Sequence, residues 1–140
     1  MNQRPNSPQN SDDGSQKITN LILSLKSLKD YQIRQLVEHA QSFAPELRKR
    51  RLETNQIRKF LDAINQLKAQ LVGNDFKAIE DEVVLLKPKL AYAAARQEAV
   101  KPLNKVMAAA IDKTHDKEDF TRLVQLIESI IAYHKAEGGK

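Results

Sequence analysis

Hydrophobic residues recur every three or four positions along most of the chain, which is the spacing of one buried face on an α-helix. The first such stripe contains Ile18, Leu21, Ile22, Leu25 and Leu28. Asp30 is placed to cap a continuation through residues 33–40, and Pro45 then breaks or restarts the helix. The first third of the chain therefore predicts two helical segments.

The clearest stripe follows Thr54, a suitable N-cap. Gly73-Asn74-Asp75 ends this helix, and Asp75 is free to cap the next one, which spans residues 76–86. Pro88 either kinks that next helix or belongs to the first turn of another, which carries the alanine-rich residues 90–95. The stripe behind Thr54 consists of Ile57, Phe60, Leu61, Ile64, Leu67 and Leu71.

Two more helices complete the pattern. Pro102 fits the first turn of one, and Asp116 is a plausible N-cap for the last, whose stripe runs from Phe120 to His134. No segment shows sustained alternation of apolar and polar residues, and turn residues are few. The pattern predicts an all-α fold, a compact bundle of five to six helices.

The N-terminal residues differ from the rest. Residues 1–16 are rich in Asn, Ser, Gln, Pro and Asp and have almost nothing apolar to bury, so we expect a disordered tail, or alternatively a partner-docking arm. Residues 17–140 form the single helical-bundle domain. No secretory h-region and no membrane-length apolar run is present, which predicts a cytoplasmic protein without a membrane partner.

The net charge of +5 is concentrated in two zones. Residues 45–59 carry six basic and two acidic residues, and residues 87–105 carry five basic and one acidic, so each zone has a net charge of +4. In the second zone Lys89, Tyr92 and Arg96 share one helix face, while Leu90, Ala91 and Ala94 face elsewhere and can pack. Such a face suits a phosphodiester backbone.

Both zones also have a plainer interpretation. Arg48-Lys49-Arg50-Arg51 can be a solvated helix end, where cations suit the helix dipole. Tyr92 can belong to the core, with the cations beside it solvated. Sequence alone leaves these alternatives open.

Signs of catalysis are missing. There is no cysteine, and His39, His115 and His134 lie on separate segments, with His134 expected to be packed and hydrogen-bonded and His115 solvated. No zinc-helix motif, phosphate-binding glycine loop or nucleophile elbow is found, and Glu80-Asp81-Glu82 is expected to be a solvated face. We therefore expect no catalytic residue, metal, cofactor or small-molecule substrate.

Three segments carry a family resemblance: residues 54–60 (TNQIRKF), residues 85–96 (LLKPKLAYAAAR) and residues 120–135. In this order and spacing they resemble the small subunit of the type III-A CRISPR effector, the Csm complex. The resemblance covers roughly residues 45–137 and leaves the N-terminal region as a variable part.

The resemblance implies a non-catalytic helical bundle that acts in antiviral defence. Copies of such subunits stack head to tail beside the other subunits and contact the guide RNA–target RNA duplex without reading bases. Arg58, Lys59, Lys87, Lys89 and Arg96 match basic positions of the segments, and Lys101 joins them from the second basic zone. The roles of Tyr92 and Tyr133 stay open. The alternatives are a helical protein–protein adaptor or the small subunit of a sister type III subtype.

Overall fold

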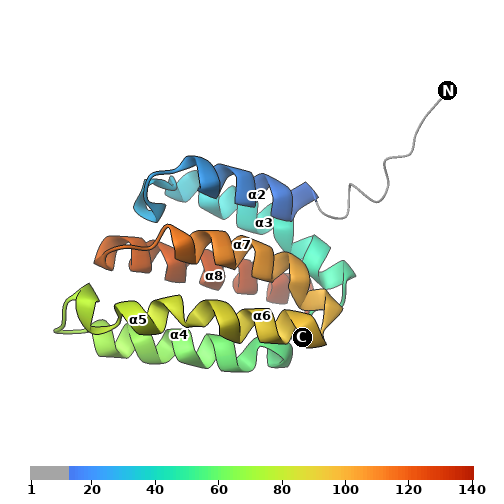
Figure 1. Cartoon of the computed structure of the whole chain (residues 1–140). Helices are drawn as coiled ribbons and strands as arrows, with labels where there is room; N and C mark the ends of the chain where they lie inside the picture. The colour runs from blue at the N-terminus through green and yellow to red at the C-terminus, as the bar shows by residue number, and fades with distance from the viewer. Residues whose placement is uncertain (1–12) are drawn as a thin grey trace.

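The computed structural model describes residues 13–140, whose helices stack in three layers (Figure 1). The central layer is the pair α7 (Lys101–Asp112) and α8 (Lys117–Ala136). One outer layer is the pair α2 (Asp13–Ser24) and α3 (Ile33–Lys49), and the other consists of α4 (Arg58–Leu71), α5 (Glu80–Val84) and α6 (Leu86–Arg96). The connections contain the 3-10 turns η1 (Leu28–Asp30), η2 (Thr54–Ile57), η3 (Phe76–Ala78) and η4 (Glu98–Val100).

This architecture confirms the all-α prediction. Six helices of 11 to 20 residues and the short α5 account for the regular structure of residues 13–140, which contain no strand. Buried hydrophobic side chains from Ile18 to Ile130 join in one cluster. No helix in the described part of the chain is long and apolar enough to cross a membrane.

The central layer packs on two sides, because α7 contacts both α2 and α6 while α8 contacts α3. Each of its helices therefore buries a broad apolar face. In α7 the buried residues are Pro102, Leu103, Val106, Met107, Ala109, Ala110 and Ile111. In α8 the buried hydrophobic residues are Phe120, Leu123, Val124, Leu126, Ile127 and Ile130.

Several helix boundaries follow local signals. Asp116 Oδ1 accepts a hydrogen bond from Asp119 N at 2.8 Å, which confirms Asp116 as the N-cap of α8. Pro102 lies in the first turn of α7, and Pro88 lies in the first turn of α6. Gly73 has a φ of 78°, which suits the turn after α4.

Other local signals were wrong. Pro45 lies inside α3, whose helix continues to Lys49. Pro45 and Gln41 are both exposed, so water can hydrate the Gln41 carbonyl that proline leaves without its helical partner. Asp30 ends η1 and does not cap α3, whose N-cap position is Gln32. The side chain of Asp75 makes no capping hydrogen bond.

Thr54 is also no helix cap. It lies within η2, where Glu53 N donates to Gln56 Oε1 at 3.0 Å in the capping arrangement. The buried hydroxyl of Thr54 donates instead to the backbone oxygen of Lys140 at 2.8 Å. The Thr54 hydroxyl therefore bonds to a residue 86 positions away in the sequence and not to a backbone N–H of its own helical turn.

The first helix begins earlier than expected. Residues 13–16, assigned to the tail from sequence, form the first turn of α2, and Ser15 is buried. Gly14 N donates to Glu46 Oε2 of α3 at 2.9 Å, so a distant carboxylate caps this helix. A side chain at position 14 would overlap that carboxylate. The predicted tail residues 1–12 lie outside the described residues.

One buried carboxylate fixes the end of the bundle opposite η2. Asp119 is fully buried and accepts hydrogen bonds from Ser27 Oγ at 2.6 Å, Lys29 N at 2.8 Å and His115 N at 2.9 Å. It therefore ties the segment after α2 and the loop before α8 to the start of α8. Arg122 of the same helix adds hydrogen bonds to the backbone oxygens of Lys29 and Tyr31.

Asp119→Ala should lower the free energy of unfolding by about 3 kcal/mol, because three donors lose their acceptor in a buried place. Urea denaturation followed by circular dichroism measures this loss. Asp62→Ala on the exposed face of α4 is the control and should change stability by less than about 0.5 kcal/mol. Equal stability of the two variants would contradict the role given to Asp119.

Candidate nucleic-acid interface

Side chains from α4 and α6 meet around a hollow on the outer face of their layer. Lys59 of α4 lines it together with Leu85, Pro88, Lys89 and Tyr92, and its volume is about 420 Å³. Lys59, Lys89 and Tyr92 are all exposed. We call Lys59, Lys89, Tyr92 and the neighbouring Arg96 the α4–α6 surface.

Tyr92 is the aromatic centre of this surface. Its side chain is 65% exposed, so the core alternative for this residue is wrong. The Arg96 guanidinium carbon lies 5.7 Å from the ring centroid, and Arg96 Nη1 donates to Tyr92 Oη at 3.3 Å. The contact holds a cation against one side of an accessible ring. Tyr133, in contrast, is half-buried and packs against the core.

The helical spacing of α6 produces this outer face. Leu86, Leu90 and Ala94 are buried at intervals of four residues, which turns Lys89, Tyr92 and Arg96 outward as predicted. Ala94 packs as expected, whereas Ala91 does not, and Ala93 is turned partly inward although the helical spacing places it beside Lys89, Tyr92 and Arg96. Ala91 is exposed, and Ala93 is half-buried against the core.

Two of the predicted basic residues have acidic partners. Lys87 Nζ lies 2.6 Å from Asp112 Oδ1 of α7, and Lys101 Nζ lies 3.2 Å from Glu98 Oε1. Both pairs are well exposed, so each contributes at most about 1 kcal/mol to stability. The pairs do lower the local positive potential, and the second basic zone is therefore not one uniform surface.

Arg58 lies on a different groove from Lys59. It lines a hollow of about 310 Å³ between α4 and α8, with an apolar lining of Leu61, Ile64, Ile127 and Ile131. Lys101 borders a third hollow together with Arg50 and Lys105. The structure thus brings Lys59, Lys89 and Arg96 onto one surface. Arg58 and Lys101 lie on other hollows, and Lys87 pairs with Asp112 of α7.

Sequence analysis missed two features of these surfaces. The apolar part of the α4–α6 hollow, Leu85 and Pro88, was given no place on a surface, although Leu85 is 46% exposed. Its position four residues before Lys89 was the available signal. Arg48, Lys49 and Arg51 of the first basic zone surround a separate hollow at the end of α3, which no sequence pattern indicated.

Two of the three histidines make hydrogen bonds inside the bundle. His134 is fully buried, and its Nε2 donates to the backbone oxygen of Leu52 at 2.9 Å, as a packed histidine should. His115 is exposed, as expected. His39 Nδ1 lies 2.7 Å from the hydroxyl of the buried Tyr31. Within residues 13–140, no three His, Asp or Glu side chains gather in a way that would hold a metal ion.

Fold and surface together define an all-α protein whose accessible chemistry is cationic and aromatic. Comparison with known proteins identifies the family within this class. The family model described as Csm2 Type III-A matches residues 30–140. The CRISPR system Cms protein Csm2 of Streptococcus thermophilus is 32% identical over 91 residues, which cover 64% of this chain and 75% of that protein. The chain belongs to the Csm2 family, the small subunits of type III-A CRISPR complexes.

The buried His134 predicts how stability depends on pH. Burial, with help from the nearby Lys135 and Arg48 cations, holds the pKa of His134 below its ordinary value, and burial does the same to the pKa of His39. As pH falls below about 6.5, the unfolded chain binds protons that the folded chain does not. The stability that the neutral histidines contribute is therefore complete above pH 6.5. It is lost as the pH falls toward the lowered pKa values of His134 and His39.

Urea denaturation at pH 7.5 and 5.5 should show this loss, at most about 1.4 kcal/mol per pH unit for each histidine. His134→Gln keeps a donor for the Leu52 carbonyl and removes the titrating group, so its loss of stability between the two pH values should be smaller. An equal loss in the parent protein and the variant would show that His134 is not responsible.

Proposed function

We propose that the α4–α6 surface binds the sugar-phosphate backbone of the guide RNA–target RNA duplex, and that the protein does so as a non-catalytic subunit of its effector complex. The observation that carries this proposal is the meeting of Lys59 of α4 with Lys89 and Tyr92 of α6 around one hollow. Cations and an exposed ring contact phosphates and sugars of any sequence. A guide-directed complex needs that property, because base pairing already reads the sequence.

The side chains of this surface have different roles in the proposed RNA binding. Lys59 and Lys89 are point charges that approach phosphates from two helices. Arg96 is held beside Tyr92, and its planar guanidinium can donate to two phosphate oxygens at once. Arg58, Lys87 and Lys101 act at the margins, where Lys87 and Lys101 exchange Asp112 and Glu98 for phosphate oxygens.

Reversing the charge of three residues tests the surface directly. If each copy neutralises three phosphates, binding to single-stranded RNA should have a log–log salt slope of roughly −2, which is about a twentyfold loss of affinity between 50 and 200 mM salt. The triple variant Lys59→Glu, Lys89→Glu, Arg96→Glu should lose affinity equally for unrelated sequences and show a flatter slope. Fluorescence anisotropy measures both quantities.

The matched control reverses three exposed cations of the α2–α3 layer, on the other side of the bundle: Lys17, Lys26 and Arg34. This variant has the same net charge as the first, so a difference between them reports position. Both should keep the parent's helical content, because exposed charges contribute little to stability. Equal RNA binding by the two variants would refute the surface, and no RNA binding by the parent protein would favour the adaptor alternative.

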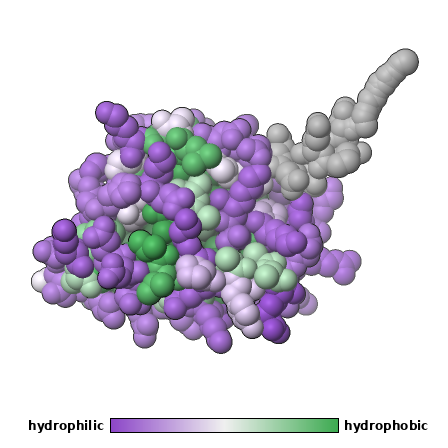
Figure 2. Space-filling model, in the orientation of Figure 1, coloured by the Kyte–Doolittle hydropathy of each residue, from purple (hydrophilic) through white to green (hydrophobic). Residues whose placement is uncertain are grey.

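We further propose that copies of this chain associate through apolar side chains on the face shown in Figure 2. Hydrophobic groups gather there over α2 and over α5, and the exposed apolar residues of these helices include Leu23 at 56% and Val84 at 54%. Exposed apolar patches of this kind are typical of contacts between proteins.

The double variant Leu23→Glu, Val84→Glu should therefore lower the average mass that sedimentation equilibrium finds at high protein concentration. Val72→Glu is the control, because Val72 is 79% exposed and follows the last residue of α4, outside both helices. A concentration-independent monomer mass for the parent protein, or the same decrease in the control, would contradict this contact.

A further inference from the structure

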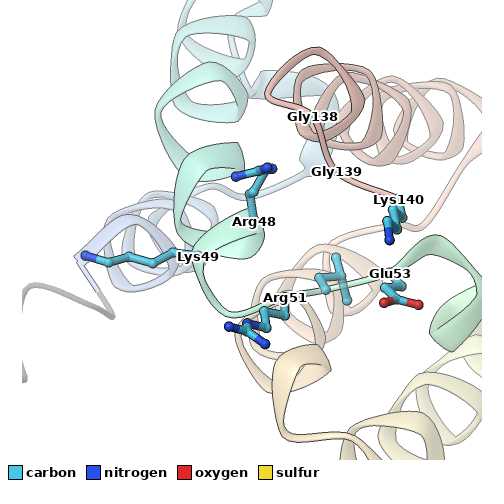
Figure 3. Close-up of a pocket in the computed structure, with 8 residues that line it drawn as sticks. Arg48, Lys49, Arg51, Glu53, Gly138, Gly139 and Lys140 are labelled. Atoms are coloured by element: carbon cyan, nitrogen blue, oxygen red, sulfur yellow. The ribbon is translucent and has the colours of Figure 1, made fainter.

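A second basic hollow lies at the end of α3, apart from the α4–α6 surface. Its volume is about 480 Å³, and its lining joins the last turn of α3 to the segment after α8. We call it the α3-end hollow (Figure 3). It is lined by Arg48, Lys49, Arg51, Leu52, Glu53, Gly138, Gly139 and Lys140.

The charges around this hollow are unbalanced. Arg48, Arg51 and Lys140 approach it from different points of the chain, whereas the side chain of Lys49 extends away from it in Figure 3. Glu53 is the acidic side chain among the lining residues. No carboxylate within residues 13–140 pairs with Arg48 or Arg51. Like charges gathered in this way repel one another unless an anion joins them.

The backbone of Arg51 is unusual for its residue type. Arg51 has a φ of 66°, the left-handed region. Arg51 N donates to Arg48 O at 2.9 Å and Leu52 N donates to Leu47 O at 3.0 Å, which is the Schellman ending of a helix. Glycine is favoured at this position because it has no Cβ. The helix dipole favours cations in the last turn, but it does not require one here.

Two glycines complete the hollow. Gly138 has a φ of 93°, and a Cβ on it would lie 3.2 Å from Arg48 Nε, so glycine lets the backbone come close to the guanidinium. A Cβ on Gly139 would overlap the His134 ring. His134 therefore lies directly below the lining of the hollow, and its Nδ1 has no hydrogen-bond partner in the described part of the chain.

From this arrangement we infer that the α3-end hollow is a binding site for a phosphate oxyanion, separate from the α4–α6 surface. The guanidinium groups of Arg48 and Arg51 and the ammonium group of Lys140 belong to residues that line the hollow, and groups of this kind donate to phosphate oxygens. The arginine at position 51 places a donor where glycine would give the more relaxed backbone. The phosphate can be a free ion or the terminal phosphate of an RNA strand, since the hollow has room for the sugar that follows.

His134 gives a readout that does not depend on RNA. The nearby Arg48 cation helps to lower the pKa of His134, so a bound phosphate should offset it and raise that pKa. Inorganic phosphate should therefore shift the His134 imidazole proton resonance saturably, compared with chloride at equal ionic strength. RNA trinucleotides of one sequence, with a 5′-monophosphate or a 5′-hydroxyl, then distinguish the two sources of phosphate.

The variant Arg51→Gly separates binding from folding. It removes a donor and relaxes the left-handed position, so phosphate affinity should fall about tenfold while the melting temperature does not fall. Lys26→Gln is the control and should change the affinity less than about twofold, because Lys26 is exposed and does not line the hollow.

Two results would overturn the site: a His134 resonance that inorganic phosphate does not shift saturably, or Arg51→Gly binding phosphate as tightly as the parent protein. If the 5′-monophosphate trinucleotide acts at much lower concentration than inorganic phosphate and the 5′-hydroxyl form has no effect, the occupant is an RNA end. If inorganic phosphate acts as well as the trinucleotide, it is a free phosphate. Loss of RNA binding through the α4–α6 surface would leave each of these results unchanged.

Discussion

The packing of α7 and α8 between two outer layers is the constraint on which the other features depend. A helix that is covered on two sides has little circumference left for charged residues. In α7 and α8 the charged side chains, such as Lys105 and Glu128, therefore lie on the parts of each helix that the outer layers leave exposed. Asp119 is a charged residue that remains inside, and it does so with three donors directed at its carboxylate.

Pairing then divides those cations into two kinds. Lys29, Lys68, Lys87 and Lys101 lie beside carboxylates in exposed ion pairs. Lys59 and Lys89 have no such partner within residues 13–140, and Arg96 is placed beside a tyrosine. A polyanion can compete for the paired lysines without unfolding the protein, because exposed pairs add little to stability. The unpaired group is the centre of the surface on which we propose that RNA binds without its sequence being read.

Local patterns predicted much of the fold and only part of the site. The stripes of α4 and α8 were evident, and so were the Asp116 cap and the place of Pro102 in α7, because each depends on residues that are close in sequence. The start of α2 depends on Glu46, 32 residues from Gly14, and the contact of Thr54 is with Lys140. Contacts between residues so far apart in sequence cannot be predicted from local patterns, because the fold alone brings the residues together. For the same reason, the sequence could not show that the neighbours Lys59 and Arg58 lie on different surfaces. Lys59 lines a hollow with α6, and Arg58 lines one with α8.

The central claim is that RNA lies on the outer face of the α4–α6 layer. Titration of a short RNA of arbitrary sequence into the ¹⁵N-labelled protein, followed by amide chemical shifts, tests it most directly. The account predicts that the largest changes occur at Lys59 and along residues 85–96, with similar maps for unrelated sequences. Changes confined to α2 and α3, or a map that changes with the RNA sequence, would contradict it.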